Sequence, residues 1–158
     1  RSFDPVFKMS PPLRSQAAVD AVIGGLRDGT IDCLVSDHAP HAAEEKDVEF
    51  NYAPDGVIGM ESLLAVAVKT LIEPGLLPWP QLIAKLTTNP ARILRLEKKG
   101  TLSTGADADV TLIDPKRKWT IDANAFKSKS RNCPFHGWTV TGKAVCTIVA
   151  GVVKYRDM

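Results

Sequence analysis

The sequence predicts an α/β fold that ends in a small β unit, and two observations support this prediction. An amphipathic helix over residues 16–28 leads directly into a short, mostly apolar strand over residues 31–36, and such a strand is typical of a buried parallel sheet. From Gly100 onward, the helical pattern is replaced by alternating, strand-like segments.

The helices are recognised by their periodicity and by their end signals. Ser15 is the expected N-cap of the first helix, and Gly29 stands where a C-terminal glycine ends it. Apolar side chains recur at helical spacing over residues 63–72, which predicts a second helix. Two shorter helices are predicted to begin at residues 78–80 and 88–90, where prolines occupy the first turns.

Residues 38–59 show no clear period and are predicted to form a long loop. Prolines and glycines interrupt this segment, and acidic residues lie between them. Loops of about 20 residues are usually functional or disordered. We therefore expect this loop to carry part of the functional site.

The last third of the chain predicts short strands. Residues 109–114 alternate and are expected to end at Pro115, and residues 119–121 predict a further strand. Residues 139–155 predict a closing hairpin with its turn at Ala150-Gly151.

The composition excludes several classes of protein. Of the 158 residues, 44% are hydrophobic, and 20 basic and 18 acidic residues are well mixed, so we expect no nucleic-acid or membrane partner. We expect neither a membrane-spanning helix nor a signal peptide. Cys33, Cys133 and Cys146 lack CxxC spacing, which favours free thiols in a reducing cytoplasm.

The run Ser36-Asp37-His38-Ala39-Pro40-His41 is the candidate functional centre. Asp37 follows the predicted buried strand and opens the long loop, and strand ends of this kind carry the chemistry of parallel α/β folds. A carboxylate with imidazoles suits a divalent metal such as zinc, and the carboxylate can also take a proton from water. From the residues alone, ordinary capping and loop contacts stay open as the alternative.

Four stretches of the chain follow a known pattern of motifs. They are Lys8-Met9-Ser10-Pro11-Pro12-Leu13-Arg14, the run from Ser36 to His41, Thr88-Asn89-Pro90-Ala91-Arg92-Ile93-Leu94, and Gly100-Thr101-Leu102 followed by Gly105–Val110. With these motifs the chain resembles the amidohydrolase superfamily, and within it the class I bacterial dihydroorotases. The last two motifs are shared with dihydropyrimidinase and allantoinase, whereas the first two are more specific.

The resemblance implies the C-terminal portion of a metal-dependent hydrolase (β/α)8 barrel plus strands of a small β-sandwich. Residues 1–100 would end the barrel, with residues 31–36 as its eighth strand, and residues 101–158 would belong to the sandwich. The first seven strands and most ligands of one or two zinc ions would lie in the N-terminal part of the same protein. We expect the chain to be unstable without that part, because it would expose a barrel edge.

The resemblance also implies residue roles. Asp37 matches the eighth-strand aspartate that binds the metal and shuttles the proton. His41 matches the histidine that contacts the substrate carboxylate. Ser10 stands where many members have a substrate-binding asparagine, and Asp55 and Gly56 stand where backbone groups touch the pyrimidine ring.

Two of these matches depart from the family pattern. Serine at position 10 reaches less far than asparagine, although it still forms a hydrogen bond. Asp55 replaces an aromatic residue and brings an acid near an anionic substrate, so the backbone of Gly56 is the firmer contact. His38 belongs to the motif but is expected to be structural.

The implied function is zinc-dependent, reversible hydrolysis of (S)-dihydroorotate to N-carbamoyl-L-aspartate in cytoplasmic pyrimidine synthesis. The implied partners are the small-molecule substrate, the N-terminal part of the protein, a second copy in a homo-oligomer, and aspartate transcarbamoylase. Two alternatives stay open. One is a related cyclic amidase, such as a dihydropyrimidinase, hydantoinase or allantoinase; the other is a non-catalytic partner of aspartate transcarbamoylase, against which Asp37 and His41 argue.

Overall fold

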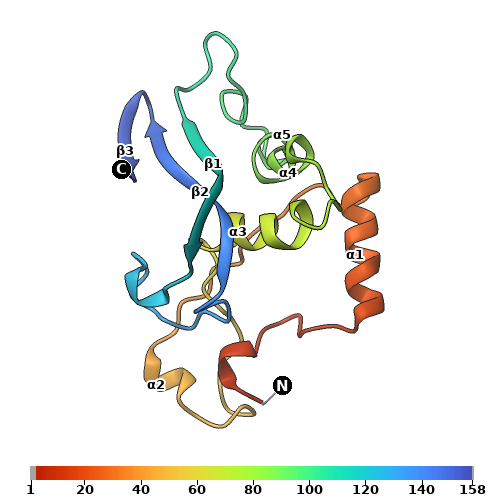
Figure 1. Ribbon diagram of the computed structural model, residues 1–158, viewed down its shortest axis with the longest axis vertical. Helices are drawn as coiled ribbons and strands as arrows, with labels where there is room; N and C mark the ends of the chain where they lie inside the picture. The colour runs from red at the N-terminus through yellow and green to blue at the C-terminus, as the bar shows by residue number, and fades with distance from the viewer. Residues whose placement is uncertain (1–2, 158) are drawn as a thin grey trace.

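Helices occupy the first two thirds of the chain and a small sheet the last third, as the sequence predicts (Figure 1). The computed structural model describes residues 3–157. Helix α1 spans Gln16–Asp28, with Ser15 at its N-cap and Gly29 ending it at φ 90°. Glycine suits this left-handed position because it has no Cβ atom to strain.

The other helical elements are short, and their bounds agree with the predicted positions near residues 63–72, 78–86 and 88–94. Two 3-10 turns, together with a short helix inside the predicted loop, are additions that the sequence pattern did not indicate. The elements are η1 (Pro5–Phe7), α2 (Ala43–Lys46), α3 (Leu63–Ala67), the π-helical turn η2 (Val68–Ile72), α4 (Trp79–Leu86), α5 (Thr88–Ile93) and the 3-10 turn η3 (Ala123–Ala125).

Three antiparallel strands form one sheet in the order β1-β2-β3: β1 (Val110–Thr120), β2 (Thr139–Val149) and β3 (Val152–Arg156). The predicted turn at Ala150-Gly151 is confirmed, with both residues at positive φ. The expected strand end at Pro115 is wrong, because β1 continues to Thr120. A register shift between Asp114 and Lys118 accommodates the proline as an irregularity, which is one of the few places a strand tolerates it.

Residues 31–36, where the sequence predicts a strand, form no strand pairing among residues 3–157. The backbone hydrogen bonds of this segment run instead from Ile31 N–H to the Gly25 carbonyl, at 2.9 Å, and from Leu34 N–H to the Lys85 carbonyl, at 3.1 Å. A strand needs a hydrogen-bonded neighbour along its length. One parallel bridge, between His38 and Val57, follows directly after the segment. Its place as the eighth strand of a barrel stays a prediction.

Two hydrophobic clusters hold the elements together, and α3 lies between the sheet and α1 (Figure 1). The first cluster joins α1, α3, η2 and α4 through Leu26, Ala67, Val68, Leu71, Leu77 and Leu82. The second joins the end of the long loop and α3 to the β unit through Ile58, Ala65, Ile121, Ala123, Cys133 and Val140. The second cluster therefore fixes the long loop against the β unit.

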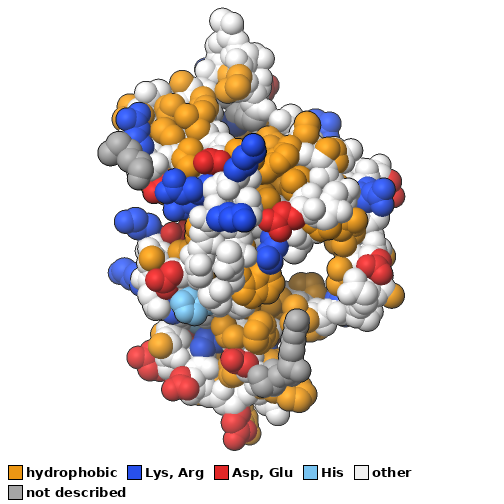
Figure 2. Space-filling model, in the orientation of Figure 1, with side chains coloured by type: hydrophobic (Ala, Val, Ile, Leu, Met, Phe, Trp, Pro, Cys, Tyr) orange, Lys and Arg blue, Asp and Glu red, His pale blue; other side chains and the backbone are white. Residues whose placement is uncertain are grey.

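Much apolar surface nevertheless lies open to solvent. Figure 2 shows an opening between α1 and the body of the molecule, bordered in part by hydrophobic side chains. Val22 on α1 is 51% exposed and Val35 is 74% exposed. Among the described helices, none has both the length and the apolar character needed to cross a membrane.

Candidate functional site

Asp37 adopts an unusual backbone conformation at the start of the long loop. Its φ is 41°, in the left-handed region, and its side chain is exposed. Aspartate tolerates this region better than most residues, but the conformation still carries strain. Strain of this kind persists where the surrounding structure enforces it and is frequent at functional sites. The conformation turns the chain sharply from residues 31–36 into the motif.

His38 holds the motif against the far end of the loop. Its Nδ1 accepts the backbone N–H groups of Gly59 and Met60, at 3.2 and 3.3 Å. The ring therefore carries its proton on Nε2 when neutral. Ala39 N–H donates to the Val57 carbonyl at 2.9 Å, beside the bridge between residues 38 and 57. These contacts agree with the structural role expected for His38.

His41 reaches the turn that carries the other predicted substrate residues. Its Nε2 lies 2.9 Å from the Asp55 carbonyl oxygen, which makes Nε2 the donor. Its Nδ1 lies 3.4 Å from a carboxylate oxygen of Glu45 on α2. Both ring nitrogens thus face protein acceptors, and a substrate carboxylate would have to replace one of them. Contact with a substrate stays a prediction for His41.

Gly56 is the position where this turn admits no side chain. Its φ is 122°, and a Cβ atom built there would lie 2.5 Å from the Ala39 Cβ and 3.2 Å from His41 Nε2. Its N–H donates to the Lys8 carbonyl at 3.0 Å. Gly56 therefore brings the motif, the turn and the Lys8–Arg14 stretch into contact, as a close backbone approach requires.

A cavity of about 470 Å³ lies beside the turn, and Ser10 and Asp55 both line it. Most of its other lining is apolar: Phe3, Phe7, Met9, Pro12, Leu13 and Phe50. Ser10 precedes a cis peptide bond to Pro11. The structure thus brings Ser10 and Asp55 to one cavity and His41 to the Asp55–Gly56 backbone.

Two lysines fasten the Lys8–Arg14 stretch to the loop. Lys8 Nζ donates to the carbonyl oxygens of Asn51 and Ala53, at 3.0 and 2.7 Å. Lys46 Nζ, at the end of α2, donates to three carbonyl oxygens, those of Pro5, Lys8 and Pro54. Burial lowers the pKa of Lys46, and the nearby Asp55 carboxylate acts in the opposite direction. The loop is thus bound to residues 5–8 by charged donors, which form strong hydrogen bonds.

Asn132, from the segment between β1 and β2, is a site residue that the sequence motifs do not predict. Its Nδ2 donates to the carbonyl oxygens of Ala39 and Gly56, at 3.0 and 3.2 Å. The side chain is buried, with 6% exposure. No spacing or periodicity in the sequence marks Asn132, which lies 93 residues from Ala39 along the chain.

The metal-ligand prediction rests on Asp37. Among residues 3–157, no three His, Cys, Asp or Glu side chains come together as a set that could hold a metal ion. One exposed carboxylate fits the role of a single zinc ligand but cannot hold the ion alone. A zinc site that includes Asp37 would need further ligands from outside this chain.

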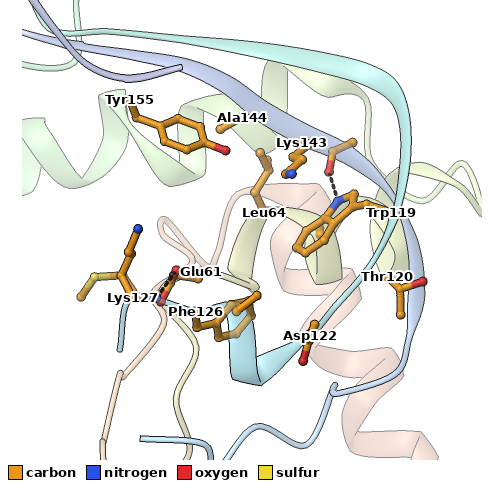
Figure 3. A pocket seen from close by; sticks show the side chains of 14 residues that line it. Glu61, Leu64, Trp119, Thr120, Asp122, Phe126, Lys127, Lys143, Ala144 and Tyr155 are labelled. Carbon is orange, nitrogen blue, oxygen red and sulfur yellow. Dashed lines mark hydrogen bonds between the residues drawn. The ribbon is translucent and has the colours of Figure 1, made fainter. Parts of the chain in front are cut away.

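A second cavity, of about 510 Å³, lies between α3 and the β unit and contains none of the predicted site residues. Figure 3 shows Trp119, Phe126 and Leu64 around it, and the Trp119 Nε1–H bond to the Gly142 carbonyl. Glu61 at its rim accepts the Lys127 N–H at 3.0 Å. This cavity belongs to the junction of the two units.

Known proteins match nearly the whole chain. A dihydroorotase of Syntrophus aciditrophicus is 47% identical over 156 residues, and one of Geobacter sp. is 49% identical over 156 residues. Each match covers 99% of this chain but 36% of the relative, so the chain spans about a third of the length of these curated relatives.

Solved structures agree with the predicted fold class. An L-hydantoinase (dihydropyrimidinase) from Arthrobacter aurescens superposes with a TM-score of 0.92 at 32% identity, over 98% of this chain and 35% of that one. The sequence pattern of the amidohydrolase family matches residues 10–154. The predicted resemblance and fold class are therefore confirmed, and the chain belongs to the amidohydrolase family.

Proposed function

We propose that the protein to which this chain belongs is a dihydroorotase, which opens the ring of (S)-dihydroorotate to N-carbamoyl-L-aspartate and closes it again. One observation carries the proposal: Asp37, held at φ 41°, opens the loop that brings His41 onto the Asp55–Gly56 backbone. The dihydroorotases that are 47–49% identical to the chain support the same activity.

In this proposal, Asp37 moves the proton. Water attacks the ring amide carbonyl and gives up a proton to the Asp37 carboxylate, the ring C–N bond breaks, and the leaving nitrogen receives the proton. A positioned carboxylate suits this general base and general acid role. The Asp37 side chain is exposed, which leaves its oxygens accessible.

The remaining residues bind and orient the substrate. His41 would meet the ring carboxylate with an N–H donor, and the backbone of Asp55 and Gly56 would meet the ring amide groups. Ser10 would add one hydrogen bond from the cavity wall. Zinc, when bound, would lower the pKa of water and polarise the ring carbonyl. Asp37 would be this chain's ligand to it.

We place the reaction in the cytoplasm, in pyrimidine synthesis. The free thiols of Cys33, Cys133 and Cys146 support a reducing compartment. The N-terminal part of the protein is the partner that the site requires. A second copy of the protein and aspartate transcarbamoylase are further partners suggested by the family resemblance alone.

A second candidate is a cyclic amidase for neutral rings, such as dihydrouracil or a hydantoin. The apolar cavity wall of Phe7, Leu13 and Phe50 favours it, because it would accept an apolar ring substituent. Asp55 on the same wall would also repel a ring carboxylate if its side chain faced the ligand. The likeness to a hydantoinase structure supports the same candidate.

The experiment that separates the candidates is a substrate panel on the whole, zinc-loaded protein. We expect kcat/KM for dihydroorotate to exceed that for dihydrouracil and hydantoin by at least about 100-fold, because a site built for a carboxylate loses that contact with a neutral ring. Removal of zinc with a chelator should abolish turnover, and added zinc should restore it. Faster opening of a neutral ring would refute the dihydroorotase assignment.

A further inference from the structure

The Asn132 side chain connects the C-terminal unit to the candidate site. Its Nδ2 donates to the Ala39 carbonyl, in the motif, and to the Gly56 carbonyl, in the substrate turn. The backbone carbonyl of Asn132 accepts the Ile58 N–H at 3.1 Å. Asn132 therefore bonds to both segments that the His41–Asp55 hydrogen bond joins, which are the motif and the Asp55–Gly56 turn.

The orientation of this amide is fixed by its partners. Two carbonyl oxygens can be met only by the NH2 end of the amide, so Oδ1 points the other way. Oδ1 is buried and has no hydrogen-bond partner among residues 3–157. Burial of an unpaired oxygen costs free energy of folding. The two hydrogen bonds that Asn132 donates offset that cost.

Further contacts hold the segment that carries Asn132. Glu61 accepts the backbone N–H groups of Lys127 and Ser128, each at 3.0 Å, and Figure 3 shows the first of these bonds at the rim of the second cavity. Cys133, the next residue, is buried in the cluster that also contains Ile58. The Asn132 amide is thus anchored from outside the motif and the turn that it joins.

We propose that Asn132 is a positioning residue, which holds the His41 loop and the Gly56 turn at the separation that substrate binding requires. The proposal rests on the proposed function for its substrate. It assigns to the β unit a part in the active site, because two donors from that unit fix the distance between the two ends of the long loop, at Ala39 and Gly56.

The test uses the whole, zinc-loaded protein with the variants Asn132→Ala and Asn132→Asp, and Asn124→Ala as the control. Asn124 is exposed in η3, eight positions earlier, and lines neither of the two cavities. We expect Asn132→Ala to raise KM for dihydroorotate about tenfold or more, with kcat within about threefold, because loop position governs binding before chemistry. Asn124→Ala should leave both constants unchanged.

The aspartate variant gives a readout that a merely structural role would not move. An ionised carboxylate repels the two carbonyl oxygens, whereas a neutral carboxyl group can donate one hydrogen bond. The ratio of KM between Asn132→Asp and wild type should therefore fall as the pH is lowered. A ratio that stays constant with pH, or equal KM values for Asn132→Ala and wild type, would overturn the proposal. If Asn132→Ala does not fold, the aspartate variant decides.

Hydrogen exchange separates this proposal from the proposed function. In Asn132→Ala we expect faster exchange of the Ala39 and Ile58 amides, with the amides of β2 unchanged. If wild type fails to turn over dihydroorotate, the dihydroorotase assignment fails, and faster exchange at those two amides still supports the positioning role. Unchanged exchange at both amides would refute the positioning role whatever the substrate.

Discussion

Gly56 shows how a single residue limits what the site can be. Its φ of 122° and the 2.5 Å approach of a Cβ atom to Ala39 leave no room for a side chain. We expect Gly56→Ala to lower the free energy of unfolding by about 1–3 kcal/mol and to raise KM for the substrate, because the loop must move away from the turn. Thermal unfolding and steady-state kinetics measure the two effects.

Gly105 provides the matched control for that substitution. It also has a positive φ, of 88°, but no atom lies within 4 Å of a Cβ built there. Gly105→Ala should therefore cost about 1 kcal/mol from backbone strain and leave KM unchanged. Equal KM values for Gly56→Ala and Gly105→Ala would contradict the close-approach argument.

His41 is the residue that should distinguish a carboxylated ring from a neutral one. We expect His41→Ala to reduce kcat/KM for dihydroorotate by about 100-fold, since it removes the donor that faces the ring carboxylate. The same variant should change the slow turnover of dihydrouracil by less than about fivefold. Parallel losses on both rings would assign His41 to the Asp55 and Glu45 contacts alone.

Single site residues can be predicted from the sequence where they belong to a motif of known spacing. Residues that act across long separations in the chain cannot. Asp37 and His41 lie four positions apart and could be singled out at once. Asn132 and Lys46 act through backbone carbonyls far along the chain, and a donor to a carbonyl needs no particular partner residue. Nothing in the sequence can therefore point to them.

Asp109, directly before β1, forms contacts whose contribution to stability depends on pH. The Asp109 carboxylate accepts a hydrogen bond from Lys99 and another from the Ala150 N–H, at 2.8 Å, which lower its pKa, the Lys99 bond most. A carboxyl group with a lower pKa in the folded state adds stability above its unfolded pKa of about 4. That stability is lost as the pH falls through the folded value.

We therefore expect Asp109→Asn to lower Tm at pH 7 and to lose this difference from wild type below about pH 4. The comparison of Tm across that range is the measurement, with both proteins free of metal so that zinc loss does not contribute. Asp114→Asn is a suitable control, because Asp114 lies on β1, five positions after Asp109, and forms no ion pair among residues 3–157. A difference in Tm that grows on acidification would contradict the sign.

Helix ends and the hairpin turn were predictable because their signals are local, as at Ser15, Gly29 and Ala150-Gly151. The error at Pro115 has a different origin. Pro115 interrupts a strand locally, but β2 pairs on both sides of it and carries the strand onward. Residues 31–36 have the apolar character of a strand without a neighbour to pair with in this chain.

Large apolar side chains lie open to solvent on several elements of the described chain. Large apolar side chains that are at least half exposed include Val22, Val35, Leu13, Met60, Leu94 and Leu102. β1 and β3 also leave the outer edges of the sheet without a strand partner among the described residues. Such edges and patches bind other chains.

We expect the 158-residue chain produced alone to bind a hydrophobic dye and to self-associate, and to become monodisperse when produced with the preceding part of the protein. Light scattering and dye fluorescence follow the change. A monodisperse isolated chain that unfolds cooperatively would show that the chain is stable without the preceding part of the protein.

The most direct test of the account is the rate at which the whole, zinc-loaded protein opens dihydroorotate before and after Asp37→Asn. Asparagine keeps the size of the side chain and tolerates the left-handed φ of 41°, so the fold and Tm should be preserved. We expect kcat to fall by about 100- to 10,000-fold, because the amide cannot carry the proton. A variant that folds, binds zinc and retains kcat within about threefold of wild type would contradict the central role of Asp37.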